Sequence, residues 1–536
     1  MIKILKEWRM KKFTQLFFRK TRFFIMLGGV LIVNLSHAAA FNSNVSSNFN
    51  SISQDNKDWN HQLADMSGSG NGLIDRQQSL QMGEWALRQL QGQAPLVDDP
   101  WLQDSLQGIT GQLSALALPE APLGLVIIND RTINAFAIPA GVFGVNLGLL
   151  DKARNLDEVA GVLSHEIAHV SQRHYQNRGN EKTKQLLMQM GGMLAGIAAS
   201  KADSGAGIAV MAGTQAMVAN NAAAFSRSQE QEADRIGMQI MALGGYDVNA
   251  MPNFFALMNQ QNQVKPNALI PSFVLSHPLT ADRLSEARLR ATTYRQATAI
   301  QAQNDSGQYY RKTLFDQMQW RARYFTHSIN KNDLIIASKT SNGAKLALAM
   351  QYIDERDFSN AQKTLLPFAS QISDLSNPLA VIVQATLDTA QGQHAQAITR
   401  LTALHNLMPE RRDIRLYLTD SVLAKGTPTQ SELQTSANLL QPLSRQNPRD
   451  IQVWQRLEQI SQQLAKISTG NTKTLQEINV LRYRAQNEFW QNNLEAAVTT
   501  LTQAKKLALI LNSQAILATI NDQLRQVQSA NQYKPA

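Results

Sequence analysis

The feature that most constrains this chain lies at residues 162–174, which read VLSHEIAHVSQRH. Its apolar positions have the spacing of a helix packed into a core; they are Val162, Leu163, Ile167, Ala168 and Val170. Inside this run stand His165, Glu166 and His169, which are groups that a core normally excludes. Positions four apart share a helix face, so the imidazoles of His165 and His169 can face a common point. Either the two histidines share a ligand or the helix carries an unusually polar face.

HEIAH fits the pattern H-E-x-x-H, in which two imidazoles on one helix face supply two zinc ligands. Glu166 is placed to act as a base toward water rather than to bind the metal. The chain has no cysteine, so any metal site must use nitrogen and oxygen donors. The metzincin continuation fails, because Gln172 and Tyr175 stand where it needs glycine and histidine. His174 follows His169 by five residues, a helical rotation of about 140°, and we interpret it as a surface or second-site histidine.

The third ligand is expected on a later helix, in FSRSQEQEADRIGMQIMALGGY at residues 225–246. Glu230 and Asp234 are four apart and share a face, whereas Glu232 is turned by about 200° from Glu230 and should face solvent. Alone, this stretch fits a solvated helix face equally well. Together with HEIAH it predicts that Glu230 binds the metal and that Asp234 accepts the N–H of a ligating histidine.

These residues predict an open catalytic site with one Zn2+ per chain. The three ligands His165, His169 and Glu230 leave a coordination position for water. Zinc lowers the pKa of that water to about 7, and Glu166 takes its proton and passes it to the leaving amine. The predicted reaction is peptide-bond hydrolysis.

His277, in the segment LSHPLTADR, has three interpretations. It can stabilise an oxyanion next to the metal. It can instead bind zinc as a fourth ligand, which displaces the water and holds the enzyme latent. The third interpretation is a turn histidine with no metal role.

The N-terminus has the layout of a secretory signal peptide, which we assign to residues 1–40 and expect to be cleaved. Its apolar stretch is shorter than the roughly 20 residues that span a bilayer; an uncleaved anchor is the alternative. Residues 1–40 also hold most of the positive charge, since the whole chain carries +10 and the remainder +3, so no nucleic-acid partner is indicated. Residues 41–70 are rich in Ser and Asn and predict a flexible leader. An exported chain without cysteine favours a bacterial periplasm.

The rest of the chain divides into two predicted domains. Residues 71–335 carry helical patterns around β-branched runs at residues 123–150, which predict a small sheet ahead of the HEIAH helix. Residues 336–536 are helical throughout and contain pairs of alanines twelve apart, which we expect where paired helices touch: Ala349 and Ala361, Ala385 and Ala397, Ala485 and Ala497. Pro409 and Pro448 fall where such repeats would end. The spacing favours an α-solenoid of tetratricopeptide-like repeats over a generic helical bundle, and such repeats form concave protein-binding surfaces.

The motifs HEIAH, ExxAD at Glu230–Asp234 and SHPLTADR together resemble the zinc peptidases of family M48, gluzincins related to the CAAX prenyl protease and Oma-type enzymes. The resemblance implies the same ligands and the same base, with Asp234 behind them and His277 as a regulatory fourth ligand. NAFAIPAGVFGVNLGLL also resembles the family's strand and turn before the metal helix. This implies that four residues line the cleft and pair with substrate backbone: Asn134, Ala135, Phe136 and Ala137. One departure is PAG at residues 139–141, where relatives often have a second glycine.

The expected fold class is mostly α with a small β-sheet, a gluzincin-type metallopeptidase domain followed by the repeats. With a signal peptide in front and repeats behind, the chain resembles periplasmic members of the family that act in outer-membrane protein quality control. That resemblance implies degradation of misfolded or stalled β-barrel proteins and assistance to their assembly. The implied partners are unfolded or misassembled outer-membrane proteins and, through the repeats, the barrel-assembly machinery, with peripheral contact to the outer membrane.

Three alternatives remain at this point. The first is a chaperone or assembly scaffold whose zinc site is structural or kept shut. Glu166 argues against a purely structural site, because a structural metal site needs no base. The second is a latent protease with chaperone activity, which satisfies both interpretations. The third is a membrane enzyme that keeps its signal sequence as an anchor.

Overall fold

A three-stranded sheet lies where the β-branched runs predict one. In the computed structural model its strands are β1 (Gly124–Ile128), β2 (Ala135–Ile138) and β3 (Val142–Asn146). Their order is β1-β3-β2, with β1 parallel and β2 antiparallel to the central β3. The turn at residues 139–141 has positive φ at Ala140 and Gly141, so the departure from the family pattern places an alanine where glycine is favoured. Because the order is β1-β3-β2, β2 is an edge strand, and the tight turn joins it to β3.

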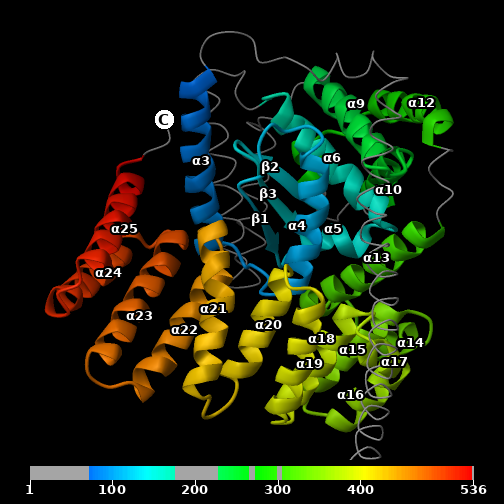
Figure 1. The fold of residues 1–536 in the computed structure, drawn as a ribbon. Coiled ribbons are helices and arrows are strands. Elements are labelled where there is room, and N and C mark those ends of the chain that lie inside the picture. Colours follow the sequence, from blue (N-terminus) through cyan, green and yellow to red (C-terminus); the bar gives the residue numbers. More distant parts are fainter. Residues whose placement is uncertain (1–71, 175–226, 265–271, 299–304, 534–536) are drawn as a thin grey trace, which may run out of the picture. The chain divides into compact units, whose positions relative to one another are not determined.

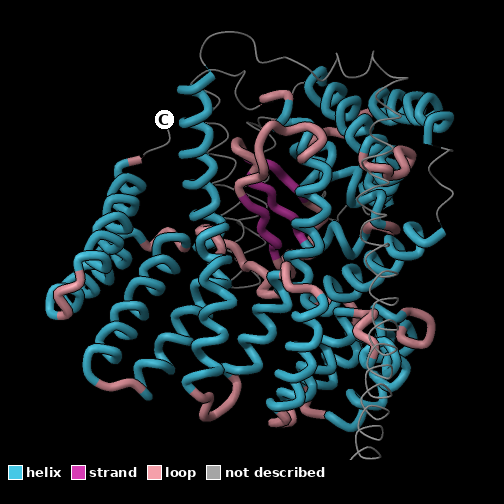
Figure 2. The backbone as a smooth tube through the Cα atoms, in the orientation of Figure 1, coloured by secondary structure: helices cyan, strands magenta, loops and turns pink. Residues whose placement is uncertain are grey.

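The structure describes residues 72–174, 227–264, 272–298 and 305–533. The predicted signal peptide and leader lie outside these residues, and the predicted domain boundaries stay predictions. In the part of the chain that is described, no helix combines the length and the apolar character that a membrane crossing needs. Figures 1 and 2 show a mostly helical chain with one small sheet, which confirms the predicted fold class.

Two helices that precede the strands in the sequence and two that follow them contact the sheet. α3 (Gly72–Gln93) and α4 (Pro100–Ser114) contact β1, α5 (Leu147–Lys152) contacts β3 and α6 (Leu156–Ser171) contacts β2. α6 begins where the side chain of Asn155 accepts the N–H of Glu158, and the acids of its first turn favour the helix N-terminus. From there α6 runs buried through the core. It is the HEIAH helix.

α9 (Arg227–Leu243) packs against α6. The two helices come close together at Gly237, where an added Cβ would lie 3.1 Å from the backbone N of His165. A glycine at this position lets the backbones meet with no side chain between them. Asp234 and Glu230, about one and two turns before Gly237, are thereby brought next to HEIAH. α10 (Ala250–Val264), α11 (Ser272–Ser276) and α12 (Ala281–Thr298) complete this region.

The predicted repeats form helical hairpins. The three alanine pairs join α15 (Asn342–Asp354) to α16 (Phe358–Leu365), α18 (Pro378–Ala390) to α19 (His394–Leu407), and α23 (Gly470–Trp490) to α24 (Leu494–Ile510). All six alanines are buried, as expected of small residues in paired helices. Pro409 and Pro448 follow the ends of α19 and α21 (Gln430–Gln446), as predicted. The remaining elements are α13 (Asp305–Thr326), α14 (Lys331–Ala337), η1 (Leu366–Phe368), α17 (Ala369–Ser373), α20 (Arg412–Leu423), α22 (Ile451–Ile467) and α25 (Gln514–Gln532).

Charged side chains join the hairpins to the helices around the sheet. α20 contacts α4 and α23 contacts α3. Arg412, the first residue of α20, donates to Asp104 of α4 at 2.7 Å and to the carboxylate of Asp450, which caps α22. The backbone N–H of Asp413 also donates to Asp104, at 2.9 Å. Arg412 therefore holds two carboxylates from distant parts of the sequence at a mostly buried point.

We expect Arg412→Ala to lower the free energy of unfolding by about 2–3 kcal/mol, because it removes the shared cation of two largely buried carboxylates. Urea unfolding followed by circular dichroism measures the change. The control is Arg525→Ala, which breaks an exposed pair with Asp522 on α25 and should cost less than about 0.5 kcal/mol. Equal shifts of the unfolding midpoint in the two variants would contradict the expectation.

Candidate metal centre

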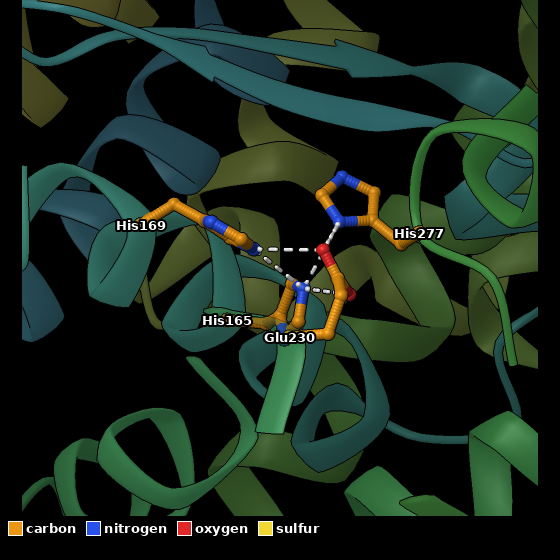
Figure 3. A group of neighbouring side chains, drawn as sticks. All are labelled: His165, His169, Glu230 and His277. Atoms are coloured by element: carbon orange, nitrogen blue, oxygen red, sulfur yellow. Dashed lines mark hydrogen bonds and ion pairs between the residues drawn. The ribbon is translucent and has the colours of Figure 1, made fainter. Parts of the chain in front are cut away.

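Four donor groups converge at the junction of α6 and α9 (Figure 3). His165 and His169 come from α6, Glu230 from α9, and His277 follows α11 directly. The Nε2 atom of His165 lies 3.1 Å from Nε2 of His169 and 3.2 Å from Nδ1 of His277. Oε1 of Glu230 lies 3.0 Å from Nδ1 of His277 and 3.4 Å from Nε2 of His169. The structure thus brings together all four residues that the sequence suggested as ligands, and all four are buried.

The spacing of these atoms fits a single metal ion. Four ligands arranged tetrahedrally at 2.0–2.1 Å from an ion are about 3.3 Å apart. Four contacts within the cluster, at 3.0 to 3.4 Å, are close to that separation, and all the donor atoms lie within 4.8 Å of one another. Three imidazoles and a carboxylate are also donor types that bind zinc and similar transition metals. The residues present therefore fit a metal.

Charged groups behind the cluster hold two of its members. Nδ1 of His165 lies 3.0 Å from Oδ1 of Asp234, and the carboxylate of Asp234 also accepts two hydrogen bonds of 2.8 Å from Arg283. A third nitrogen of Arg283 lies 2.7 Å from Oε2 of Glu230. Burial raises the pKa of Asp234, but its bonds with Arg283 and His165 outweigh burial and lower that pKa. Arg283 thus stabilises Glu230 and Asp234 in their charged form.

The histidines of α6 differ in their protonation when no ion is bound. Burial lowers the pKa of His165, but the carboxylates of Asp234 and Glu230 oppose it and raise that pKa to about 9. For His169 burial prevails, and its pKa falls well below the ordinary value. His165 therefore carries a proton on both ring nitrogens. A metal ion that binds this ring must displace one of them, so metal binding releases a proton.

Glu166 lies beside the cluster without belonging to it. Its Oε2 accepts the backbone N–H of Ala137 at 3.1 Å, and its Oε1 lies 3.3 Å from Nε2 of His277. Burial raises the pKa of Glu166 despite the nearby histidines. A carboxylate with a raised pKa at the edge of a metal site is a stronger proton acceptor than an ordinary carboxylate, so it can take and return a proton.

The backbone of β2 presents alternate residues to its two sides. The carbonyl of Asn134 accepts the N–H of Asn146, so Asn134 and, two residues on, Phe136 direct their backbone groups toward β3. Ala135 and Ala137 direct theirs away from β3, and the N–H of Ala137 is the one bonded to Glu166. Of the four residues expected to pair with substrate backbone, Ala135 and Ala137 are thus the two whose polar groups face outward.

Comparisons with known proteins identify this arrangement. The model of peptidase family M48 matches residues 97–291, the segment that contains all four donor residues and Glu166. The chain is 31% identical to the β-barrel assembly-enhancing protease of Yersinia pestis over 363 residues, 66% of this chain and 71% of that protein. This chain belongs to peptidase family M48. Similarity also extends to the β-barrel assembly-enhancing protease of Escherichia coli (strain K12), at 29% identity over 88% of this chain and 93% of that protein.

A more distant relative has a narrower match. The mitochondrial metalloendopeptidase OMA1 of Arabidopsis thaliana is 26% identical over 167 residues, 30% of this chain and 31% of that protein. Family M48 peptidases depend on a metal, and the buried cluster supplies donors for one. The chain is accordingly a metalloendopeptidase.

His174 is not a surface residue, so the surface alternative in its interpretation from the sequence was wrong. Its side chain is buried, with Nδ1 at 2.9 Å from Nδ1 of His169 and Nε2 at 3.2 Å from Oε2 of Glu232. The rotation of about 140° assumed that the helix continues, but α6 ends at Ser171. Arg173 then adopts a left-handed φ of 52°, and the chain turns back. Glu232, expected to face solvent, is partly exposed and contacts this buried histidine.

The backbone at this turn explains the position of His174. The N–H of His174 donates to the carbonyl of His169, and that of Arg173 donates to the carbonyl of Val170. This pair of bonds is the Schellman motif, in which the second residue past the helix contacts the last turn. No glycine marks the turn, so the sequence gives little sign of it. Arg283 was missed too, although it ends the SHPLTADR segment.

We expect Asp234→Asn to weaken binding of a divalent metal by about 10- to 100-fold, because it removes the charged acceptor that orients His165. Competition with a chromophoric chelator measures the dissociation constant. Asp282→Asn, at an exposed acid of α12 beside Arg283, is the control and should leave the affinity unchanged. An Asp234 variant that binds as tightly as the control would show that the contact with His165 has no influence on the metal.

Proposed function

We propose that this chain is a periplasmic zinc metalloendopeptidase of outer-membrane protein quality control, which degrades misfolded or stalled β-barrel proteins and assists their assembly. The convergence of His165, His169 and Glu230 beside Glu166 carries the proposal. Imidazole and carboxylate donors at spacings close to those of a tetrahedral site favour zinc. The names of the most fully covered relatives, β-barrel assembly-enhancing proteases, support the substrate class.

The residues of the site have separate roles in this proposal. His165, His169 and Glu230 hold the zinc, which when bound serves as a Lewis acid toward water and the substrate carbonyl. Glu166 accepts the proton of the attacking water and gives it to the leaving amine. The N–H of Ala137 fixes one oxygen of Glu166, which leaves the other to face the reacting groups. Ala135 aligns the substrate as an added strand on β2, since its backbone groups face away from β3.

We also propose that the described conformation is a latent one. His277 lies between the ligands and the base, with Nδ1 at 3.0 Å from Glu230 and Nε2 at 3.3 Å from Glu166. A substrate carbonyl and a water need this same position. The backbone N–H of Phe273 donates to the carbonyl of Ile133, just before β2, which fastens α11 beside the strand that would receive substrate. His277 must leave before peptide can bind.

The remaining assignments rest on the sequence and the relatives. Residues 1–40 would direct export to the periplasm, and the helical hairpins would provide the surface for unfolded outer-membrane proteins and the barrel-assembly machinery. Their paired helices bury alanines, as tetratricopeptide-like repeats do. Contact with the outer membrane would be peripheral.

We expect Glu166→Gln to retain zinc and to lower cleavage of unfolded casein by about 10²- to 10⁴-fold, the range associated with a general base. Zinc content by atomic emission and single-turnover cleavage of labelled casein test the two halves of this expectation. If wild-type protein holds zinc, yet neither it nor any variant cleaves even short peptides, the site is structural and the scaffold alternative replaces the enzyme.

We expect His277→Ala to cleave casein faster than wild type, because the substrate position is no longer filled. His327→Ala, at an exposed histidine outside the site, is the control and should match wild type. Zinc content is measured in parallel. A His277 variant that keeps its zinc and cleaves more slowly than the control would show that this histidine assists the reaction and does not block it.

A further inference from the structure

His169 has two ring nitrogens, and the structure gives each a distinct neighbour. Nε2 faces the donor cluster, at 3.1 Å from Nε2 of His165. Nδ1 faces the opposite way, at 2.9 Å from Nδ1 of His174. A neutral imidazole that binds a metal through Nε2 carries its proton on Nδ1 and must donate it to an acceptor. His174 provides that acceptor.

The protonation of His169 then fixes that of His174. Nδ1 of His174 can accept only if it carries no proton, so the ring proton of His174 lies on Nε2. That nitrogen is 3.2 Å from Oε2 of Glu232. Each hydrogen bond in the series therefore has one donor and one acceptor, and the series ends at a carboxylate whose side chain is 39% exposed.

We propose that His174 is a positioning residue of the metal centre, which orients His169 through Nδ1 and is itself oriented by Glu232. The inference rests on the proposed metal site. It gives His169 the kind of support that Asp234 gives His165, with an imidazole placed between ligand and carboxylate. His174 is not itself a ligand, because its Nδ1 lies behind His169 and the cluster of metal donors does not include it.

α9 contributes to both sides of the His169 ring in this arrangement. Glu230 reaches Nε2 directly, at 3.4 Å. Glu232, two residues later and on another face of α9, reaches Nδ1 through His174. The helix end of α6 is what makes this geometry available, since the left-handed Arg173 returns His174 to the last turn. One helix thus restrains the ring of a ligand on its neighbour from two directions.

The simplest competing explanation is that His174 only fills space, and three variants separate the two. His174→Phe keeps an aromatic ring but removes both hydrogen bonds. His174→Asn places an amide oxygen near the position of Nδ1 and keeps the acceptor for His169. Glu232→Ala leaves His174 in place but removes its orienting carboxylate. Arg235→Ala is the control, because it removes a partly exposed charge that lies 3.7 Å from Glu232.

The experiment measures the dissociation constant for Zn2+ by chelator competition on the full chain, together with the melting temperature of the metal-free protein. We expect His174→Phe to weaken zinc binding by about 10- to 100-fold, His174→Asn to recover most of that loss, and Glu232→Ala to weaken binding by a smaller factor. The control should bind as wild type does. The melting temperature separates lost packing from lost metal affinity.

The outcomes distinguish this inference from the proposed function. If wild type binds zinc and both His174 variants bind it as tightly as wild type does, His174 only packs. The inference is then overturned while the metallopeptidase stands. If His174→Asn is as weak as His174→Phe, the acceptor is not what matters, and the inference is again overturned. If wild type itself does not bind zinc, the proposed function fails first. If His174→Phe does not fold, the dissociation constants of His174→Asn, Glu232→Ala and the control Arg235→Ala decide between the two explanations.

Discussion

The burial of several polar donors at one point, where α6 meets α9, is the constraint on which the rest of this region depends. An unpaired buried carboxylate or imidazolium costs several kcal/mol, so each of these groups needs a partner of opposite charge or a hydrogen-bond partner. The structure supplies them from separate elements: Arg283 from α12 holds Glu230 and Asp234, and Asp234 in turn meets His165. Gly237 lets the two helices approach closely enough for these contacts. The metal centre and its charge partners therefore form a single packing unit.

Helical periodicity made part of this unit predictable. Within one helix the rotation per residue is fixed, so the spacing of HEIAH alone is enough to place His165 and His169 on one face. The same argument places Glu230 and Asp234 together on α9. It also predicts the buried alanines of the hairpins, since small residues at a fixed offset on either side of a short turn allow the paired helices to pack closely. What these predictions share is that each depends on geometry inside one or two neighbouring elements.

The features that the sequence did not predict depend on where an element ends or on contacts between distant elements. His174 was misplaced because the helix ends three residues before it, at a left-handed arginine where glycine would be the usual signal. Arg283 stands in a recognisable motif, but its role arises from meeting two acids about 50 residues earlier in the chain. The sequence also did not predict which backbone groups of β2 face away from the sheet, because only the pairing with β3 decides this.

The four donors also differ in how the backbone holds them. His165, His169 and Glu230 belong to helices of 16 and 17 residues, whose backbone hydrogen bonds hold them in place. His277 lies in the short connection between the five-residue α11 and α12, so a change in a few backbone dihedrals can displace it. Its ring stacks on Phe273, and the N–H of Phe273 reaches Ile133 through a hydrogen bond of 3.3 Å, longer than the usual range. Three donors thus lie on helices, and the fourth lies in a short connection between helices. Exchanging His277 for water would leave the other three in place, which is the property that a latent metallopeptidase requires.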